Sequence, residues 1–178
     1  LLQIRNLQVD FQTRAGTVTA VHDMTFRVPV GGTVALVGES GSGKSVTAQA
    51  ILGILPRTAR ISSGEILFHD PERTRIKVPQ DRRRPYVDLL KLHPNQREFR
   101  AIRGNRISMI FQEPVTSLSP LHTIGDQIGE ALILHRKVSD AEARELTVET
   151  LGMVGFSEPR RAINTYPFEL SGGLRQRA

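Results

Sequence analysis

The sequence predicts an α/β fold in which an N-terminal antiparallel β subdomain, a strand–loop–helix core and an inserted helical subdomain follow one another. Three observations predict this fold. Apolar and polar residues partly alternate at the start, a short apolar run leads into glycine-rich sequence, and helical periodicity marks the C-terminal third. With 178 residues and 39% hydrophobic content, the chain is long enough to bury one substantial core.

The N-terminal part of the chain predicts strands. Apolar and polar residues partly alternate in segments 2–9 and 18–28. A turn at Ala15-Gly16 lies between the segments, which favours an antiparallel pair of strands. The uninterrupted apolar run 34–37 is typical of a strand buried on both faces. We expect further strands at residues 65–69 and 106–111, separated by a basic stretch.

Helices are predicted after the glycine-rich segment and again beyond Pro120. Apolar residues recur at helical spacing from Val46 to Leu55, and Pro56 supplies a stop. A helix is expected from Thr123, which is placed to cap its start, and five of its residues share one face: Ile124, Ile128, Ala131, Leu132 and His135. A further helix is expected to begin at Ser139, with Glu142 completing a capping box, and to end at Gly155.

Composition narrows the class of protein. Because no apolar run approaches the ~18 residues that span a bilayer, we expect no membrane crossing by this chain. The absence of cysteine excludes disulfides, thiolate metal sites and thiol catalysis. The net charge is +6, but much of the excess lies between residues 73 and 106 with few aromatic residues interleaved, so we favour a solvated loop at about 70–87 over a nucleic-acid site.

The strongest motif lies between the apolar run and the helix that follows it. It matches G-x-x-x-x-G-K-[ST] in full. Glycines allow backbone N–H groups to surround phosphate, and the helix N-terminus adds its positive dipole end. Lys44 is expected to contact the β- and γ-phosphates, and the Ser45 hydroxyl to coordinate Mg²⁺. The predicted phosphate site consists of Gly38, Glu39, Ser40, Gly41, Ser42, Gly43, Lys44 and Ser45.

A second predicted anion site follows much later in the chain. Leu170 precedes Ser171, Gly172 and Gly173, and Ser171 lies 127 residues after Lys44 (171 − 44). Ser171 can cap a helix, and two glycines expose backbone amides to a phosphate. Alone, this pattern also fits an ordinary helix start. Downstream of a complete phosphate loop, it resembles the LSGG signature of ABC ATPases.

Two further positions fit that resemblance. Gln112 follows the strand expected at residues 106–111, where ABC ATPases carry a glutamine that approaches Mg²⁺ and the attacking water. Phe11 lies 27 residues before Gly38 (38 − 11), where the family places an aromatic ring against adenine. A strand phenylalanine also fits an ordinary core position, and both interpretations of Phe11 stay open.

Longer segments resemble one subfamily, the dipeptide, oligopeptide and nickel importer ATPases, with microcin C and glutathione importers as near relatives. The matching segments are residues 37–45, 103–107, 111–114, 116–121 and 166–173. The resemblance implies the P-loop NTPase core of the ABC ATPase type. It also implies an incomplete ABC nucleotide-binding domain over residues 1–178, with a β and P-loop core at 1–112 and a helical subdomain at 113–178.

The same resemblance implies an ATP-hydrolysing motor that takes up peptides at the cytoplasmic face of the bacterial inner membrane. Its cofactors are ATP and Mg²⁺. Its partners are ABC membrane subunits, a second nucleotide-binding domain and, indirectly, a solute-binding protein, with no nucleic acid. The sequence given stops at Ala178, before the family's Asp-Glu strand and switch histidine, so we expect this segment to be nearly inactive alone. A soluble ABC-type ATPase acting on nucleic acid and a non-hydrolysing nucleotide-binding module stay open as alternatives.

Overall fold

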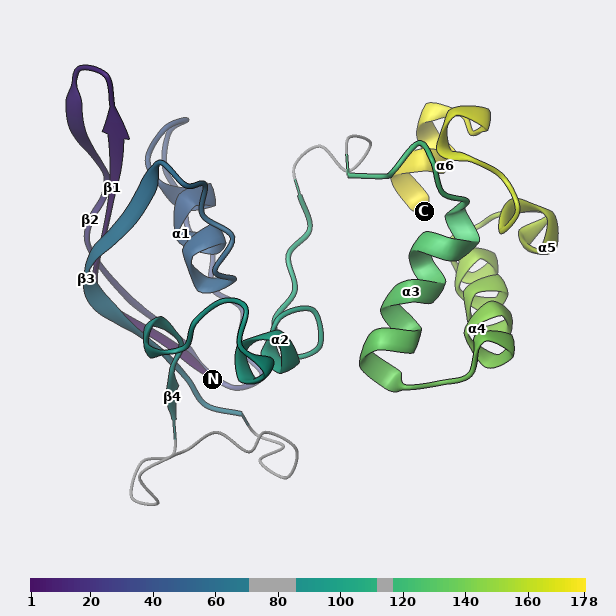
Figure 1. The fold of residues 1–178 in the computed structure, drawn as a ribbon, viewed down its shortest axis with the longest axis horizontal. Helices are drawn as coiled ribbons and strands as arrows, with labels where there is room; N and C mark the ends of the chain where they lie inside the picture. Colours follow the sequence, from purple (N-terminus) through teal and green to yellow (C-terminus); the bar gives the residue numbers. More distant parts are fainter. Residues whose placement is uncertain (71–85, 112–116) are drawn as a thin grey trace. The chain divides into compact units, whose positions relative to one another are not determined.

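The fold was analysed in a computed structural model, which describes residues 1–70, 86–111 and 117–178. The chain forms two compact units, Leu1–Ser108 and Met109–Ala178, and each is described by itself. The described part of the first unit holds a β-sheet with short helices, and that of the second is helical (Figure 1). The first unit ends at Ser108, four residues before position 112, where the β and P-loop core was predicted to end.

The sheet of the first unit is antiparallel, as predicted. It contains β1 (Leu2–Thr13), β2 (Gly16–Val28), β3 (Ala59–Phe68) and β4 (Val87–Asp88) in the spatial order β2-β1-β3-β4. The hairpin turns at Gly16, whose φ of 123° suits glycine and few other residues. The pairing extends from Thr13–Gly16 to Leu2–Val28, so the expected hairpin is confirmed and each of its strands is longer than predicted.

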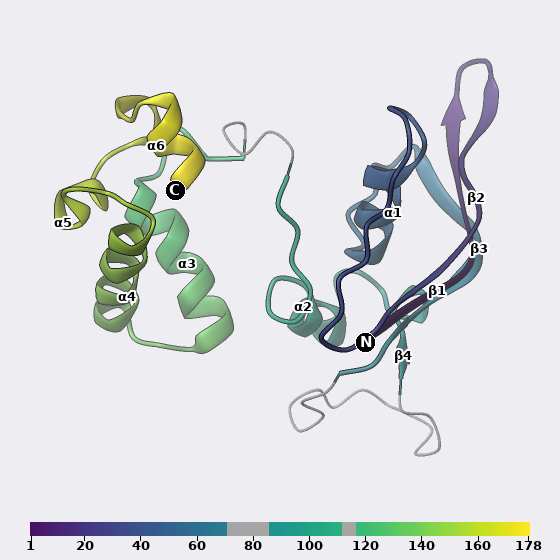
Figure 2. The ribbon, with the colours of Figure 1, turned by 180° about the vertical axis from the view of Figure 1, so that it is seen from behind.

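One face of the sheet carries the core of this unit. Ile4, Leu7 and Ile66 are fully buried there. Helix α1 (Lys44–Ile51) lies along the sheet in both views (Figures 1 and 2), and its buried Ala50 belongs to the same apolar cluster. The segment after β4 completes the cluster with η1 (Leu89–Lys91) and α2 (Arg97–Ile102). The sheet therefore forms a fixed support for the start of α1.

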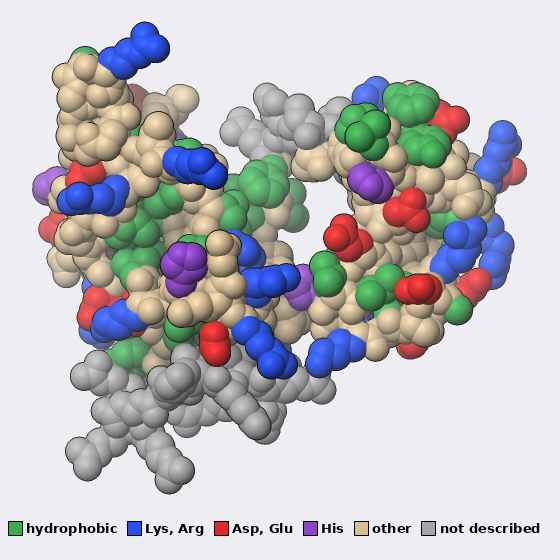
Figure 3. Space-filling model, viewed as in Figure 1, with side chains coloured by type: hydrophobic (Ala, Val, Ile, Leu, Met, Phe, Trp, Pro, Cys, Tyr) green, Lys and Arg blue, Asp and Glu red, His purple; other side chains and the backbone are tan. Residues whose placement is uncertain are grey.

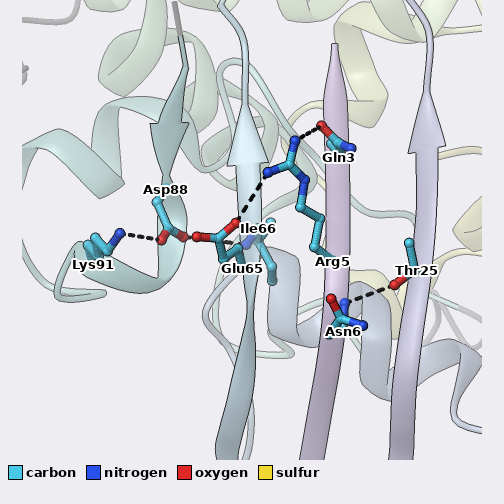
Figure 4. A network of polar contacts seen from close by, with 8 residues as sticks. All are labelled: Gln3, Arg5, Asn6, Thr25, Glu65, Ile66, Asp88 and Lys91. Atoms are coloured by element: carbon cyan, nitrogen blue, oxygen red, sulfur yellow. Dashed lines mark hydrogen bonds and ion pairs between the residues drawn. The ribbon is translucent and has the colours of Figure 1, made fainter. Parts of the chain in front are cut away.

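Polar contacts link neighbouring strands at the N-terminal end of β1 (Figure 4). The Arg5 guanidinium lies 3.6 Å from the Glu65 carboxylate and donates to the Gln3 side chain. The Asn6 N–H donates to the Thr25 hydroxyl on the opposite neighbour strand. Asp88 accepts from the Ile66 N–H and forms an ion pair with Lys91. These contacts link β1 to β2 and to β3, and β3 to β4.

The predictions of strands at residues 34–37 and 106–111 are wrong for this structure. Residues 34–37 run as irregular chain, with Val37 90% exposed, and residues 106–111 form only a single bridge, Arg103–Ile107, with Ile110 93% exposed. A strand buried on both faces needs neighbours that satisfy its N–H and C=O groups. In the described part of the chain, residues 34–37 have no strand beside them, so hydrophobicity alone does not produce one.

Two boundaries also differ from the prediction. Helix α1 ends at Ile51 and not at Leu55, because Gly53 adopts a left-handed φ of 61° and its N–H donates to the Ala50 carbonyl. Strand β3 begins at Ala59, six residues before the predicted start at Glu65. The additional residues of β3 pair with β1 as far as Phe11.

The second unit contains two longer helices, α3 (Ile124–Arg136) and α4 (Asp140–Met153), which lie side by side in both views (Figures 1 and 2). Short elements follow: α5 (Pro159–Ala162), η3 (Pro167–Glu169) and α6 (Gly172–Arg177). The core of this unit includes Ile124, Leu151 and Phe156.

The helix ends in this unit follow the sequence signals. Thr123 forms a reciprocal capping box with Asp126. The Ser139 hydroxyl accepts from the Glu142 N–H, so Ser139 caps α4 as predicted, but the structure does not show the return bond from the Glu142 side chain that would complete the predicted capping box. Gly155, with φ of 86°, ends α4 as predicted. Within the described ranges, no helix is long and apolar enough to cross a lipid bilayer. Hydrophobic and charged side chains of both signs share the visible surface (Figure 3).

Candidate functional site

The glycine-rich loop 38–43 leads directly into α1 and surrounds the amine of Lys44. The Lys44 Nζ donates to the Gly38 carbonyl at 2.7 Å, to the Glu39 carbonyl at 2.6 Å and to the Ser42 hydroxyl at 3.0 Å. The Ser42 N–H donates to the Glu39 carbonyl and tightens the turn. All three acceptors are neutral oxygens, so the positive charge of Lys44 stays available to an anion that enters the loop.

Gly43 fixes the loop against the sheet. Its φ is 85°, and a Cβ at this position would lie 2.6 Å from the Ala20 carbonyl oxygen and 3.0 Å from a Val21 methyl group. Only glycine combines this conformation with so close an approach. Gly43 therefore places the phosphate loop directly beside the middle of β2.

The first turn of α1 offers donors to an anion. In an α-helix the N–H groups of the first turn have no intrahelical acceptor and carry the positive end of the helix dipole. The first helical hydrogen bond here runs from the Thr47 N–H to the Gly43 carbonyl. Ser45 is exposed at this end of the helix. Its hydroxyl is therefore accessible to a cation bound with the phosphates.

Sequence reasoning missed Thr47. Its side chain is 1% exposed, and its hydroxyl donates to the Gly43 carbonyl at 2.9 Å. This contact ties the end of the loop to the helix. The signal was a β-branched hydroxyl residue in the first helical turn, where back-bonding to the carbonyl four residues earlier is common.

Phe11 lies in β1, paired with Val18 on one side and Ala59 on the other. It is half-buried and packs against the core cluster, whereas Val18 is 55% exposed. Val18 is two residues from Ala20, which touches the phosphate loop. Phe11 thus belongs to the same hairpin that supports the loop, and its proposed contact with adenine stays a prediction.

Next to Phe11, a polar cluster fixes one carboxylate. Hydrogen bonds from Ser62 and from Thr19 lower the pKa of Asp10 below its ordinary value. The Thr19 hydroxyl lies 2.7 Å from the carboxylate, and the Gln8 amide donates at 3.2 Å. Asp10 itself is 9% exposed. The charged carboxylate therefore joins β1, β2 and β3 at the end of the sheet that carries Phe11.

The predicted second anion site lies in the helical unit. Ser171 is the N-cap of α6, and its hydroxyl accepts from the Leu174 N–H at 3.3 Å. Ser171, Gly172 and Gly173 are exposed, whereas Leu170 is buried in the apolar core of the unit. Leu170 thus anchors this segment in the core, whereas the three small residues that follow it face solvent.

Two predicted features lie outside the described residues. They are Gln112, within 112–116, and most of the basic stretch, within 71–85. Among the described residues, no group of three His, Asp, Glu or Cys side chains could hold a metal. A single serine hydroxyl at the phosphate loop still fits Mg²⁺, because this ion commonly takes few protein ligands together with substrate phosphates.

Known proteins with similar sequences belong to the family that these motifs resemble. The ABC transporter family model matches residues 21–178. The dipeptide transport ATP-binding protein DppD of Bacillus subtilis is 44% identical over 99% of this chain and 48% of its own length. The DppD of Lactococcus lactis is 42% identical over 100% of this chain and 46% of its own length. The peptidoglycan transport ATP-binding protein YejF of Agrobacterium fabrum is 49% identical over 99% of this chain and 29% of its own length.

Solved structures agree on the fold. The dimeric bacterial ABC transporter cassette MJ0796 matches with a TM-score of 0.76 and 24% identity over 99% of this chain and 66% of the cassette. The predicted fold class, an α/β P-loop ATPase core with a β subdomain and a helical subdomain, is therefore confirmed. The chain spans slightly less than half the length of each DppD relative. By its motifs, its fold and a similarity to these proteins that extends over essentially all of its own length, the chain belongs to the ABC transporter family of ATPases.

Proposed function

We propose that this chain is the ATP-binding part of a motor that hydrolyses ATP to drive peptide import. The observation that carries the proposal is the identity of 42–49%, over essentially the whole chain, with proteins named for dipeptide or peptide transport. The loop geometry supports it, because Gly38–Ser45 surrounds a lysine amine beside an open helix N-terminus.

In this proposal Lys44 exchanges its contacts with the Gly38 and Glu39 carbonyls for the β- and γ-phosphates of ATP. The exchange is favourable because a charged acceptor binds an ammonium group more strongly than a neutral carbonyl does. The amides of the loop and of the first turn of α1 hold the remaining phosphate oxygens. Ser45, with Gln112, would hold Mg²⁺, which neutralises phosphate charge when bound. Phe11 would stack on adenine.

We further propose that hydrolysis requires two nucleotide-binding domains. Ser171, Gly172 and Gly173 of one domain would contact the γ-phosphate bound by the other. Residues 1–112 would form the β and P-loop core, and residues 113–178 the helical subdomain that meets the membrane subunits. The protein would then act at the cytoplasmic face of the bacterial inner membrane, with a solute-binding protein as an indirect partner and without nucleic acid.

Peptide uptake tests the proposal. The complete product of the gene is produced with its membrane subunits and solute-binding protein in cells that lack other peptide importers, and uptake of a labelled dipeptide is measured. We expect uptake with the wild type and none with Lys44→Ala. An Arg14→Gln variant, altered at an exposed position of the β1–β2 turn, serves as the matched control. Uptake that persists with Lys44→Ala would contradict the proposal.

A further inference from the structure

Several backbone hydrogen bonds close the C-terminal end of α4. The Gly155 N–H donates to the Gly152 carbonyl at 3.0 Å, and the Phe156 N–H donates to the Leu151 carbonyl at 3.0 Å. Together with the left-handed Gly155, these bonds form a Schellman motif, accompanied by burial of Leu151 and Phe156 in one apolar cluster. The motif leaves the carbonyls of Val154 and Gly155 pointing away from the helix and available to other donors.

Arg177, at the end of α6, occupies those carbonyls. Its Nη1 donates to the Gly155 carbonyl at 3.0 Å and to the Val154 carbonyl at 3.4 Å, across more than 20 residues of chain. Its Nε donates to the Gly173 carbonyl in its own helix at 3.3 Å. A guanidinium suits this task because its planar fork carries several donors, and a cation is stabilised at a helix C-terminus.

Gly155 also leaves space for the same contact. A Cβ at this position would lie 3.0 Å from the Arg177 Nη1, in addition to the strain of its positive φ. A side chain here would therefore push against the guanidinium. Glycine at 155 both ends α4 and leaves room for Arg177.

Apolar contacts fix α6 from the other side. Leu170 and Leu174 flank the exposed residues 171–173 and pack with Leu151 and Phe156. Two leucines and one arginine thus attach α6 to the C-terminal end of α4. Among the described residues, the exposed segment 171–173 is tied down by the Ser171 cap and by the Arg177 Nε bond to the Gly173 carbonyl, so its orientation depends on these anchors.

We propose that Arg177 is a positioning residue for the signature segment. By bonding the carbonyls of residues 154 and 155, it sets the direction in which Ser171, Gly172 and Gly173 face. This inference rests on the proposed function, in which that segment meets the γ-phosphate bound by a second domain. Loss of the contact would leave nucleotide binding at the loop of the same chain intact and impair the step that needs the signature.

The first test is independent of function. Hydrogen exchange is measured on the complete product of the gene for the amides of Leu174, Arg175 and Ala178, whose hydrogen bonds define α6. We expect Arg177→Gln to accelerate their exchange by about tenfold or more, and Arg177→Lys to have a smaller effect because one ammonium cannot reproduce the fork. Arg160→Gln is the matched control, since Arg160 pairs only with the exposed Glu145 in the described structure. Unchanged exchange in Arg177→Gln would overturn the proposal.

The second test uses the complete product of the gene with its partner domain. Arg177→Gln should lower kcat for ATP hydrolysis by about tenfold while ATP affinity changes by less than about twofold, with partial recovery in Arg177→Lys. Equal kcat in Arg177→Gln and wild type, or an equal loss in Arg160→Gln, would overturn the positioning role. If Arg177→Gln fails to fold, Arg177→Lys and Gly155→Ala carry both tests. A wild type that does not hydrolyse ATP would contradict the proposed function, while the exchange result would still decide the contact.

Discussion

At the scale of single residues, backbone carbonyls, one hydroxyl and one glycine order the loop around the Lys44 amine. Lys44 is held by two backbone carbonyls and one hydroxyl, and Gly43 is placed by its contact with Ala20. Sequence alone identified both residues, because the spacing of glycine, lysine and serine is itself the signal. Sequence reasoning missed Thr47, because its hydroxyl in the first helical turn indicates only a possible back-bond, and the bond to the Gly43 carbonyl becomes visible only in the structure.

Asp10 provides a prediction at this scale. Because hydrogen bonds from Ser62 and Thr19 lower its pKa in the folded state, the charged carboxylate stabilises the fold above the unfolded-state pKa, near ~4. That stabilisation is lost as the pH falls through the lowered pKa. We expect Asp10→Asn to reduce the midpoint of thermal unfolding at pH 7 and to weaken its dependence on pH between about 5 and 2. The alternative outcome, an unchanged acid dependence, would mean that the hydrogen bonds to Asp10 contribute nothing.

At the scale of elements, the sequence predicted best those strands and helices whose turns and caps are formed by residues next to them in the chain. The hairpin β1–β2 needs only its own turn at Gly16, and α3 and α4 carry their own caps at Thr123 and Ser139. Residues 34–37 are different, since a strand buried on both faces depends on neighbours. The described residues supply no neighbour there, and the apolar run lies exposed.

Gly43 gives the prediction for the loop–helix element. A methyl group at this position would lie 2.6 Å from the Ala20 carbonyl in a left-handed conformation. We expect Gly43→Ala to destabilise the first unit by about 1–3 kcal/mol and to weaken ATP binding, because the loop would have to move away from β2. Denaturant unfolding and nucleotide titration measure the two effects. Gly152→Ala is the control, since a Cβ there would meet only the Pro159 ring at 3.7 Å, an ordinary van der Waals contact, and Gly152 belongs to neither predicted anion site. Equal stability in both variants would show that the close contact at Gly43 is not required.

At the scale of the whole molecule, the sequence predicted the family better than it predicted the core. The order of the glycine loop and the signature was enough for the family, because both motifs are short and local. The two units, Leu1–Ser108 and Met109–Ala178, each hold one of these motifs. The core was harder to predict because it forms between segments that are distant in the sequence, such as β1 and β3, and no local sequence pattern indicates their pairing.

The central claim is that the loop Gly38–Ser45 binds ATP through Lys44. The most direct measurement is calorimetric titration of ATP into the complete product of the gene, in the wild type and in Lys44→Ala. Charge-assisted hydrogen bonds to an anion contribute ~1.5–3 kcal/mol, so we expect Lys44→Ala to weaken ATP binding about tenfold or more while its unfolding temperature stays close to that of the wild type. Equal affinity for ATP in the two proteins, or no binding by the folded wild type, would contradict the account.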